Sequence, residues 1–367
     1  MKYSPLSDIF AGQMQHSYPI KIKEVRRETD QCVSIALEIP EDQKELFRYT
    51  PGQYINLIKN VDGEELHRSY SLCSSPVEQE WRVAVKQIEG GAFSTYANKK
   101  LKAGDIIEVM PPNGKFTSEI KTGQAKSYLF LAAGSGITPI ISLVKTILKT
   151  EKLSQICLIY GNQKTDQIIF LEELMGLKNL FIGRLSLYFI LSRELMEEPY
   201  FNGRICREKL ELFKSKLYEP NDVDEAFICG PEEMILETRA ALEEQGIAPQ
   251  RIHVELFGTK SSAKPTKFAG LGSDKESSIL LKTDGRTVSF NLPFNSTSLL
   301  DGALKNKVNL PYACKGGVCC TCKAKLLEGE VEMVRNYGLE PEEIEAGYIL
   351  TCQSFPKSAK ISVDFDQ

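Results

Sequence analysis

Histidine is scarce in this chain, which has only His16, His67 and His253 among 367 residues. A metal site built mainly from imidazoles is therefore nearly excluded, and a histidine-based catalytic triad would have to use one of these three. An excess of charge of one sign is also lacking, since 45 Lys and Arg stand against 49 Asp and Glu, a formal net charge of −4. We therefore expect no nucleic-acid partner and no polybasic membrane patch.

Long uninterrupted apolar runs are lacking as well. Residues 127–144 carry no charge and are just long enough to be tested as a membrane span. Gly134, Gly136 and Pro139 interrupt this stretch and divide it into a strand, a turn and a helix start. Residues 1–13 have no apolar segment of the kind found in a signal peptide. We expect neither a membrane span nor an export signal.

Cysteine, in contrast, is present ten times, and five of these residues lie between positions 314 and 352. A disulfide scaffold would be short, secreted and rich in cysteine throughout, which this chain is not. At about 100–200 residues per domain, the length indicates two or three domains. With 42% hydrophobic and 26% charged residues, the composition is that of an ordinary globular protein.

The first segment, residues 1–122, consists of short apolar and β-branched runs separated by turn pairs such as Pro51-Gly52, Asp62-Gly63, Gly90-Gly91 and Pro111-Pro112. This pattern predicts an antiparallel β-barrel. The expected strands cover residues 19–23, 32–37, 54–58, 82–87 and 105–109.

The second segment, residues 123–258, alternates buried-strand runs with helical stretches such as 170–175 and 232–245. Such alternation is typical of an α/β domain with a parallel sheet. The expected strands cover residues 128–133, 156–160, 186–191, 226–229 and 252–257.

Residues 259–278 are rich in Ser, Lys and Gly and are interpreted as a linker. The remaining residues, 279–367, predict a small α+β domain. Asp284-Gly285 between two strand-like runs indicates a hairpin, and Ser298 with Asp301 indicates a capping box at a short helix.

The cysteine spacing is the strongest signal in the sequence. Cys314, Cys319 and Cys322 form a C-x4-C-x2-C loop, and Cys352 follows Cys322 after 29 intervening residues. This is the ligand spacing of a plant-type [2Fe–2S] ferredoxin, in which two irons each take two thiolates. Glycines at 316 and 317 permit the close backbone approach that lets N–H groups point at sulfur.

The alternatives at this loop are a zinc site and unrelated structural thiols. Zinc usually takes two C-x2-C pairs rather than this loop with one distant partner. Cys320 falls outside the spacing. We interpret it as a small buried side chain, with a thiol that replaces a lost ligand as the second interpretation.

Arg68-Ser69-Tyr70-Ser71 suits a phosphorylated planar ligand, because Arg can meet a pyrophosphate and Tyr can lie against an aromatic ring system. The turn at Gly91–Ser94, which includes Phe93, can offer backbone N–H groups to phosphate. The alternative is a strand with a surface arginine. The candidate flavin-contacting residues are Arg68, Ser69, Tyr70, Ser71, Val85, Lys86, Gly91, Phe93 and Ser94.

Two further turns point to a dinucleotide. Residues 129–139 run from a buried strand into a Gly-rich turn and a helix start, with Gly134, Gly136, Thr138 and Pro139, and a helix N-terminus there favours a pyrophosphate. Cys229-Gly230-Pro231 repeats the design. Two such turns in one sheet indicate a dinucleotide across the strand ends, although each alone also fits an ordinary α/β turn.

Two positions refine this expectation. Ser192-Arg193 follows a strand where the adenosine ribose of a dinucleotide could reach, and an Arg there suits the 2′-phosphate of NADPH; the alternative is a solvated surface Arg. Phe257, after the last strand, is a candidate ring over the flavin, with simple core packing as the alternative.

The order of these motifs resembles the ferredoxin–NADP reductase superfamily, in the arrangement with a C-terminal plant-type ferredoxin domain of the β-grasp type. The resemblance covers nearly the whole chain after about residue 15. It is more specific to the family of reductase subunits of phenylacetyl-CoA epoxidases in four segments, 225–231, 311–319, 336–342 and 346–353. Two departures from the family pattern stand out. Cys320 occupies a position where Ala, Ser or Gly is expected, and Ser192-Arg193 looks more like plant-type NADP reductases.

The resemblance implies an enzyme with FAD, NADPH and a [2Fe–2S] cluster that passes electrons to a di-iron oxygenase. Thr138 and Cys229 would line the contact between nicotinamide and flavin, and Cys314, Cys319, Cys322 and Cys352 would ligate the cluster. FAD rather than FMN rests on the resemblance alone. An acidic stretch at 340–345 is either a docking face or a solvated helix. An oxygen-sensitive cluster and ten cysteines lead us to expect a reducing cytoplasm.

Two other functions remain open. One is a reductase for another oxygenase or an acyl-lipid desaturase. The other is a binding subunit that keeps the folds without flavin.

Overall fold

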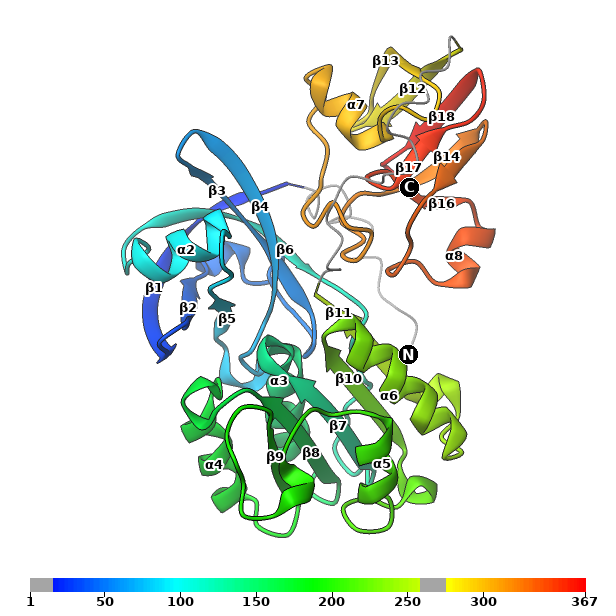
Figure 1. Cartoon of the computed structure of the whole chain (residues 1–367). Helices are drawn as coiled ribbons and strands as arrows, with labels where there is room; N and C mark the ends of the chain where they lie inside the picture. The colour runs from blue at the N-terminus through cyan, green and yellow to red at the C-terminus, as the bar shows by residue number, and fades with distance from the viewer. Residues whose placement is uncertain (1–15, 258–274) are drawn as a thin grey trace. The chain divides into compact units, whose positions relative to one another are not determined.

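The computed structural model describes residues 16–257 and 275–367 of the chain (Figure 1). One compact unit spans most of residues 18–257, and a second holds residues 275–367. Most of the segment interpreted as a linker, residues 259–274, lies outside the described residues.

The N-terminal part of the first unit is the antiparallel barrel that the sequence predicts. The sheet has the strand order β4-β3-β6-β1-β2-β5, and a bridge between Leu72 and Val83 joins the chain just after β4 to the opposite edge strand, β5. Its core includes Ile35, Phe47 and Leu57, each fully buried. The elements are β1 (Tyr18–Thr29), β2 (Cys32–Glu38), η2 (Glu41–Gln43), β3 (Tyr54–Val61), β4 (Glu64–Ser71), η3 (Pro76–Glu78), β5 (Trp81–Lys86), α2 (Ala92–Lys99) and β6 (Ile106–Asn113).

Two local expectations for this barrel are wrong. Residues 64–71 form β4, which was not among the expected strands because it begins with two glutamates. The Asp62-Gly63 turn that precedes it was predicted. Pro111 and Pro112 do not form a turn but lie inside β6. The ladder between β3 and β6 is irregular between Tyr54 and Asn56, opposite these prolines, so their missing N–H groups interrupt no regular pairing.

The second part of this unit is the expected parallel sheet, with the order β11-β10-β7-β8-β9 and four parallel pairings. Its strands and α-helices are β7 (Ser127–Ala133), α3 (Ile137–Thr150), β8 (Gln155–Asn162), α4 (Leu171–Leu180), β9 (Leu185–Leu191), α5 (Arg207–Phe213), β10 (Glu225–Gly230), α6 (Glu232–Glu244) and β11 (Ile252–Leu256). Single 3-10 turns lie at η4 (Gly134–Gly136), η5 (Thr165–Gln167), η6 (Pro199–Phe201), η7 (Pro220–Asp222) and η8 (Pro249–Arg251).

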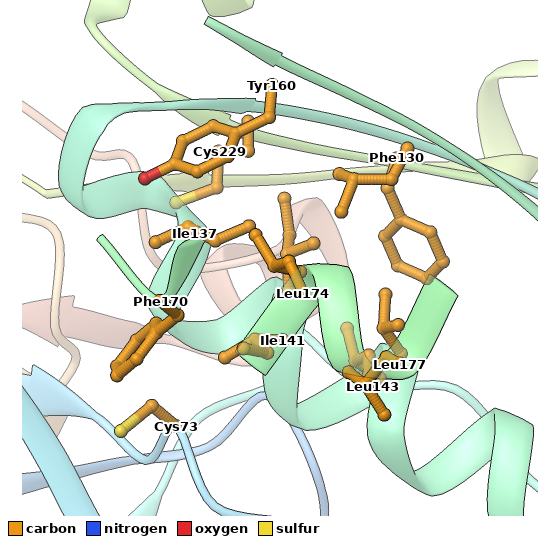
Figure 2. Packing of buried hydrophobic residues seen from close by; sticks show 14 of the residues in the cluster. Cys73, Phe130, Ile137, Ile141, Leu143, Tyr160, Phe170, Leu174, Leu177 and Cys229 are labelled. Carbon is orange, nitrogen blue, oxygen red and sulfur yellow. The ribbon is translucent and has the colours of Figure 1, made fainter. Parts of the chain in front are cut away.

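Helices cover both faces of the parallel sheet. Successive residues of a strand point to opposite faces, so alternate side chains pack against different helices. Tyr128 and Phe130 of β7 belong to the core that α3 and α4 complete, whereas Leu129 and Leu131 belong to the core under α5 and α6. Figure 2 shows the first of these cores, with Phe130, Ile141 and Leu174 among its side chains. The sheet is therefore a rigid, two-sided support for the turns at its strand ends.

The uncharged stretch at 127–144 forms β7, η4 and the first part of α3 rather than one long helix. Within residues 16–257 and 275–367, no helix combines the length and apolar character needed to cross a bilayer.

The second unit has a mixed five-stranded sheet, β13-β12-β18-β14-β16, in which β12 pairs in parallel with β18, together with a two-stranded sheet, β15-β17. This is the α+β arrangement expected of a ferredoxin domain. The elements are β12 (Glu276–Thr283), β13 (Arg286–Pro293), α7 (Leu299–Lys305), β14 (Lys323–Glu328), β15 (Val331–Met333), α8 (Pro341–Glu345), β16 (Tyr348–Leu350), β17 (Ser354–Pro356) and β18 (Lys360–Asp364).

The local signals in this unit predicted its structure correctly, with one exception. Asp284 and Gly285 both have positive φ, as a tight hairpin turn requires. The Ser298 side chain accepts the N–H of Asp301 at the start of α7, which is one of the two bonds of the expected capping box. However, β12 begins at Glu276, so residues 276–278 belong to a strand and not to the linker. Ser277 is fully buried and donates to the carbonyl of Ser358 at 2.6 Å, which explains why a serine-rich stretch continues as a strand.

Candidate functional site

The cysteine loop of the second unit directs backbone N–H groups at thiol sulfur. The N–H groups of Gly316 and Cys319 lie 3.3 and 3.4 Å from Sγ of Cys314, and the N–H of Cys314 lies 3.5 Å from Sγ of Cys319. Lys315 and Gly317 take positive φ to make this turn. A loop that wraps sulfur with amide donors stabilises negative charge on thiolates.

The four predicted ligands come together as two pairs. Cys314 is hydrogen-bonded to Cys319, and Cys322 to Cys352. The hydrogen bond with Cys319, together with backbone N–H groups, lowers the pKa of the Cys314 thiol well below its usual range against the opposing effect of burial. Within the part of the chain that the structure describes, no three His, Cys, Asp or Glu side chains converge on a single ion position. Two pairs of thiols suit two irons with two thiolates each better than one zinc.

The turn around the cluster loop is supported from outside by Gln353. Its side-chain N–H donates to the carbonyl of Lys315 at 2.8 Å. A Cβ atom on Gly317 would lie 2.9 Å from the carbonyl oxygen of Arg335 and 3.1 Å from Gln353, so this position accepts only glycine. Cys320 has positive φ and is partly buried against the domain core, in agreement with its interpretation as a packing side chain.

The candidate flavin residues lie on two neighbouring parts of the barrel. β4 places Arg68 on the surface, where one of its N–H groups donates to the carbonyl of His67, and it buries Ser71 at its end. The ring of Tyr70 lies 5.6 Å from that of Phe93. Lys86, at the end of β5, has its Nζ 3.7 Å from where a Cβ atom of Gly134 would stand, beside the nucleotide turn.

Residues 91–94 are a helix start rather than a free turn. Gly91 is the N-cap of α2, and the Ser94 hydroxyl is engaged within the segment, accepting the N–H of Ile88 at 3.1 Å and donating to the carbonyl of Gly91. Phe93 and Val85 are buried in the barrel core. The segment can therefore offer phosphate the N–H groups of its first turn, but not the side chains of Phe93 and Val85.

The first nucleotide turn is packed tightly against the second. A Cβ atom on Gly136 would lie 2.1 Å from the carbonyl oxygen of Cys229, so glycine is required there. Gly134 has positive φ, and its carbonyl accepts the hydroxyl of Tyr160 at 2.9 Å. Thr138 is buried and donates to the carbonyl of Ser135 at 3.1 Å. Pro139 lies in the first turn of α3.

The second turn, Cys229-Gly230-Pro231, joins β10 to α6, with Pro231 as the N-cap. Cys229 is fully buried, and burial raises the pKa of its thiol well above the usual range. The thiol therefore stays protonated and acts through packing rather than as a nucleophile. A Cβ atom on Gly230 would lie 3.1 Å from that of Ala133, so the backbone of the two turns forms one continuous surface.

Glu255 was not identified from the sequence. This residue lies on β11, in register with Cys229, and its carboxyl group accepts the Ser71 hydroxyl at 3.3 Å. Burial raises the pKa of Glu255 to about 8, although the hydrogen bond from Ser71 opposes the shift. A titratable group with a strongly raised pKa between a flavin candidate and a nucleotide candidate marks a functional position. The only signal in the sequence was its place near the carboxyl end of a parallel strand.

The remaining candidates lie at the same edge of the sheet. Ser192 and Arg193 follow β9 and are exposed, and their N–H groups bond to the carbonyls of Asn162 and Gln163 just beyond β8. Phe257 follows β11 and is 45% exposed, so it is not a core residue of the unit to which it belongs. The structure therefore gathers Gly134, Gly136, Thr138, Cys229, Gly230 and Glu255 around two touching turns.

The residues fit the three groups that the sequence implies. Gly136 packs against the Cys229 carbonyl, so backbone atoms lie where a dinucleotide would approach. The N-terminal N–H groups of α3 face the same place. An exposed arginine, a lysine and the N-terminus of α2 suit the phosphates of a flavin nucleotide. Amide donors aimed at paired thiols suit a [2Fe–2S] cluster.

Comparisons with known proteins agree with this arrangement. Family models match for an oxidoreductase FAD-binding domain at residues 19–118, an oxidoreductase NAD-binding domain at 130–240 and a 2Fe-2S iron-sulfur cluster binding domain at 281–357. The chain is 41% identical to one of the subunits of the 1,2-phenylacetyl-CoA epoxidase of Escherichia coli K12, over 95% of this chain and 98% of that protein. It is 31% identical to the ferredoxin reductase component of the 3-ketosteroid-9-alpha-monooxygenase of Rhodococcus rhodochrous, over 94% of this chain and 96% of that protein.

Among solved structures, phthalate dioxygenase reductase matches with a TM-score of 0.58 and 22% identity, covering 95% of this chain and 98% of that one. This likeness concerns the fold alone. The domain matches and the full-length relatives together make the chain an NAD(P)H-dependent flavin and iron–sulfur oxidoreductase. It belongs to the ferredoxin–NADP-reductase-like family whose members carry a C-terminal [2Fe–2S] domain.

Proposed function

We propose that this protein takes electrons from NADPH, passes them through FAD and a [2Fe–2S] cluster, and delivers them to a di-iron oxygenase of the phenylacetyl-CoA epoxidase type. The observation that carries the proposal is the joined surface of the two nucleotide turns, in which Gly136 meets the Cys229 carbonyl beside Ser71 and Glu255. A dinucleotide bound on this surface would lie against the strand that carries the flavin motif.

In this assignment, the cluster is held by Cys314, Cys319, Cys322 and Cys352. The flavin is held by Arg68, Ser69, Tyr70, Ser71, Lys86 and the segment 91–94. Bound FAD supplies the conversion between a two-electron hydride donor and a one-electron cluster. The protein's own residues bind and orient the reactants and keep water out.

Thr138 and Cys229 would border the place where nicotinamide meets flavin. The Thr138 hydroxyl is fixed by the Ser135 carbonyl, and the Cys229 thiol is neutral and fully buried. The carboxyl group of Glu255, which is protonated at pH 7, lies beside the Ser71 hydroxyl. Phe257 would cover the open face of the flavin, since 45% of its surface is available. Hydride transfer needs the reacting atoms roughly 3–3.5 Å apart, so the main task of these residues is alignment.

The preference for NADPH rests on Arg193. Its backbone is anchored to the carbonyl of Gln163, and its side chain is exposed at the carboxyl end of β9. An arginine at this edge of the sheet can meet a 2′-phosphate with two parallel hydrogen bonds.

The choice of acceptor rests on the 41% identity to the Escherichia coli epoxidase protein over nearly the full length of both chains. A second candidate function is a reductase for another oxygenase or for an acyl desaturase, which the similarity to the 3-ketosteroid monooxygenase component favours. Ten cysteines, including four paired as cluster ligands, suit a reducing, cytoplasmic compartment.

An anaerobic titration of the purified protein with NADPH, and separately with NADH, tests the electron path. We expect NADPH to bleach both flavin and cluster absorption at a lower concentration than NADH. A protein without visible colour, or one whose colour responds to neither nucleotide, would refute the reductase function.

Delivery to the acceptor is tested by mixing the reduced protein with purified oxygenase components of different families. We expect product formation with a phenylacetyl-CoA epoxidase and at least tenfold less with a ketosteroid monooxygenase or a desaturase. The reverse order would reject the proposed acceptor and leave the reductase function intact.

A further inference from the structure

Helix α3 carries a polar stripe that faces the flavin domain rather than solvent. Ser142, Lys145, Thr146 and Lys149 follow a spacing of three, four and seven residues from Ser142, which places them on one face of the helix. Ser142 is fully buried, and Lys145 and Thr146 are more than nine-tenths buried. Such a row of buried polar groups needs partners.

Each of the four side chains has a partner in residues 74–78, just after the flavin strand β4. The Ser142 hydroxyl donates to the Ser74 carbonyl at 2.6 Å, and the hydroxyls of Thr146 and Ser75 lie 2.7 Å apart. Lys149 reaches the carboxylate of Glu78 at 2.7 Å. The four side chains of α3 therefore contact one short segment of the flavin domain.

That segment is itself rigid. Ser75 and Glu78 form a capping box around η3, in which the Glu78 carboxylate accepts the N–H of Ser75 at 2.8 Å. The Ser74 hydroxyl donates to the Glu80 carbonyl at 2.7 Å. Glu78 thus stabilises its own turn and contacts α3 at the same time.

Lys145 is the most deeply buried charge in this contact. Its side chain is 6% exposed, and its Nζ lies 3.1 Å from Glu78 of the flavin domain and 2.9 Å from Glu173 of α4. A buried charge with two partners is sensitive to the loss of either, because the remaining charges are left without compensation. Lys149 contacts the same carboxylate but is 34% exposed, which makes it the natural comparison.

The contact is close in sequence to both candidate sites. Two residues separate Ser71 of the flavin motif from Ser74, and about one helical turn separates Thr138 of the nucleotide turn from Ser142. Cys73, between Ser71 and Ser74, packs in the same core as Ile141 and Phe170, as Figure 2 shows. Any shift of α3 on residues 74–78 would move the nucleotide turn relative to the flavin strand.

We propose that Lys145 is a positioning residue for hydride transfer, which fixes α3 and its nucleotide turn against the flavin-domain segment 74–78. The proposal rests on the assignment of the nicotinamide nucleotide to Gly134–Thr138 and of flavin to β4. Lys145 touches neither reactant. It acts through the alignment of the two surfaces that hold them.

Lys145→Met removes the charge at nearly constant length, Lys145→Arg keeps it, and Lys149→Met removes the exposed neighbour that shares Glu78. Glu78→Gln is the second test variant, because an amide oxygen can still accept the N–H of Ser75 while the ion pair with Lys145 is lost. Each FAD-loaded holoprotein is mixed anaerobically with NADPH, unlabelled or deuterated at the transferred position. The limiting rate of flavin bleaching, the nucleotide dissociation constant and the isotope effect are measured.

We expect Lys145→Met and Glu78→Gln to lower the limiting rate ten- to hundredfold, to raise the isotope effect, and to change nucleotide binding less than threefold, because misplacement acts on the transfer step. Lys145→Arg should recover most of the rate, and Lys149→Met should stay within twofold of the wild type. A limiting rate and an isotope effect at wild-type values in both Lys145→Met and Glu78→Gln, with only the melting temperature lowered, would overturn the proposal.

If Lys145→Met does not fold, Glu78→Gln alone decides between these outcomes. A wild-type protein whose flavin responds to no nicotinamide nucleotide would instead refute the proposed function. The wild-type reaction therefore tells whether the proposed function or only the proposed role of Lys145 is wrong.

Discussion

The thiol of Cys320 occupies the space that a side chain at Gly338 would need: a Cβ atom built on Gly338 would lie 2.4 Å from Cys320 Sγ. Cys320 also has positive φ and packs, partly buried, against the domain core. It therefore fills a hole in the domain core beside the cluster loop.

Cys320→Ala should leave the cluster in place, because the four paired thiols remain. Cys322→Ser should lose it or weaken it strongly, since one member of the pair with Cys352 is removed. Iron and acid-labile sulfide per chain, together with the electron paramagnetic resonance signal of the reduced protein, measure this. A normal iron content in Cys322→Ser that disappears when Cys320 is also replaced would show instead that Cys320 replaces a lost ligand.

Gly136→Ala should lower kcat/KM for the nicotinamide nucleotide more than about a hundredfold and leave FAD content unchanged. The added Cβ atom would stand 2.1 Å from the Cys229 carbonyl, so one of the two turns must move. Gly176→Ala is the matched control, because Gly176 lies within α4 with nothing near its Cβ position, and it should stabilise the protein by roughly 0.5–1 kcal/mol. Nucleotide reduction at wild-type rates in Gly136→Ala would remove this turn from the site.

Arg193→Ala should reduce kcat/KM for NADPH by about 10- to 100-fold and leave NADH within twofold. The loss corresponds to a charge-assisted contact with the 2′-phosphate, worth about 1.5–3 kcal/mol. Steady-state kinetics with a small electron acceptor and both nucleotides measure the ratio. Arg204→Ala, at another exposed arginine of the same domain, should change neither value. If Arg204→Ala carries the effect and Arg193→Ala does not, the assignment of the phosphate contact is wrong.

Glu255→Gln should become more stable relative to the wild type as pH rises. In the folded protein, burial raises the pKa of Glu255 from 4.5 to about 8, so the folded state holds a proton that the unfolded state releases. The contribution of Glu255 to the stability of the wild type therefore falls between about pH 4.5 and 8, by about 1.4 kcal/mol for each pH unit at most. Melting temperatures of holoprotein measured from pH 5 to 8 test this.

The exposed Glu233→Gln should show a difference from the wild type that does not change over the same range. A flat difference for Glu255→Gln as well would mean that the Glu255 carboxyl group is ionised in the folded protein at neutral pH.

The sequence revealed those parts of the candidate site that are local in the chain. The cysteine loop, the two glycine turns and the Asp284-Gly285 hairpin each depend on a few consecutive residues whose backbone geometry follows from residue type. Their amide contacts and the positive φ of Gly317 and Gly285 could therefore be anticipated, whereas the positive φ of Lys315 could not. Glu255 could not, because it meets Ser71 only after β11 has joined β10, and 184 residues separate the two in the chain.

The wrong expectations have similar physical causes. β4 is polar and partly exposed along much of its length, and it carries the flavin candidates Arg68 to Ser71. Apolar alternation is therefore weak there. Residues 91–94 looked like a glycine turn, yet Phe93 and Ala97 bury one side of a two-turn helix against the barrel core. Tertiary packing decided the conformation in both segments, and local composition did not reveal it.

The contact between Gly136 and the Cys229 carbonyl also bears on how the protein folds. β7 and β8 are consecutive in the chain, but β10, which pairs with the other edge of β7, is contributed almost a hundred residues later. Until β10 has joined the sheet, the turn at Gly134–Gly136 lacks the Cys229 carbonyl against which it packs. Pairings of such long sequence separation form late because their loop-closure entropy is large. Affinity for the nucleotide should therefore appear only after the whole parallel sheet has assembled, whereas the barrel and its flavin strand are complete in sequence before β7 begins.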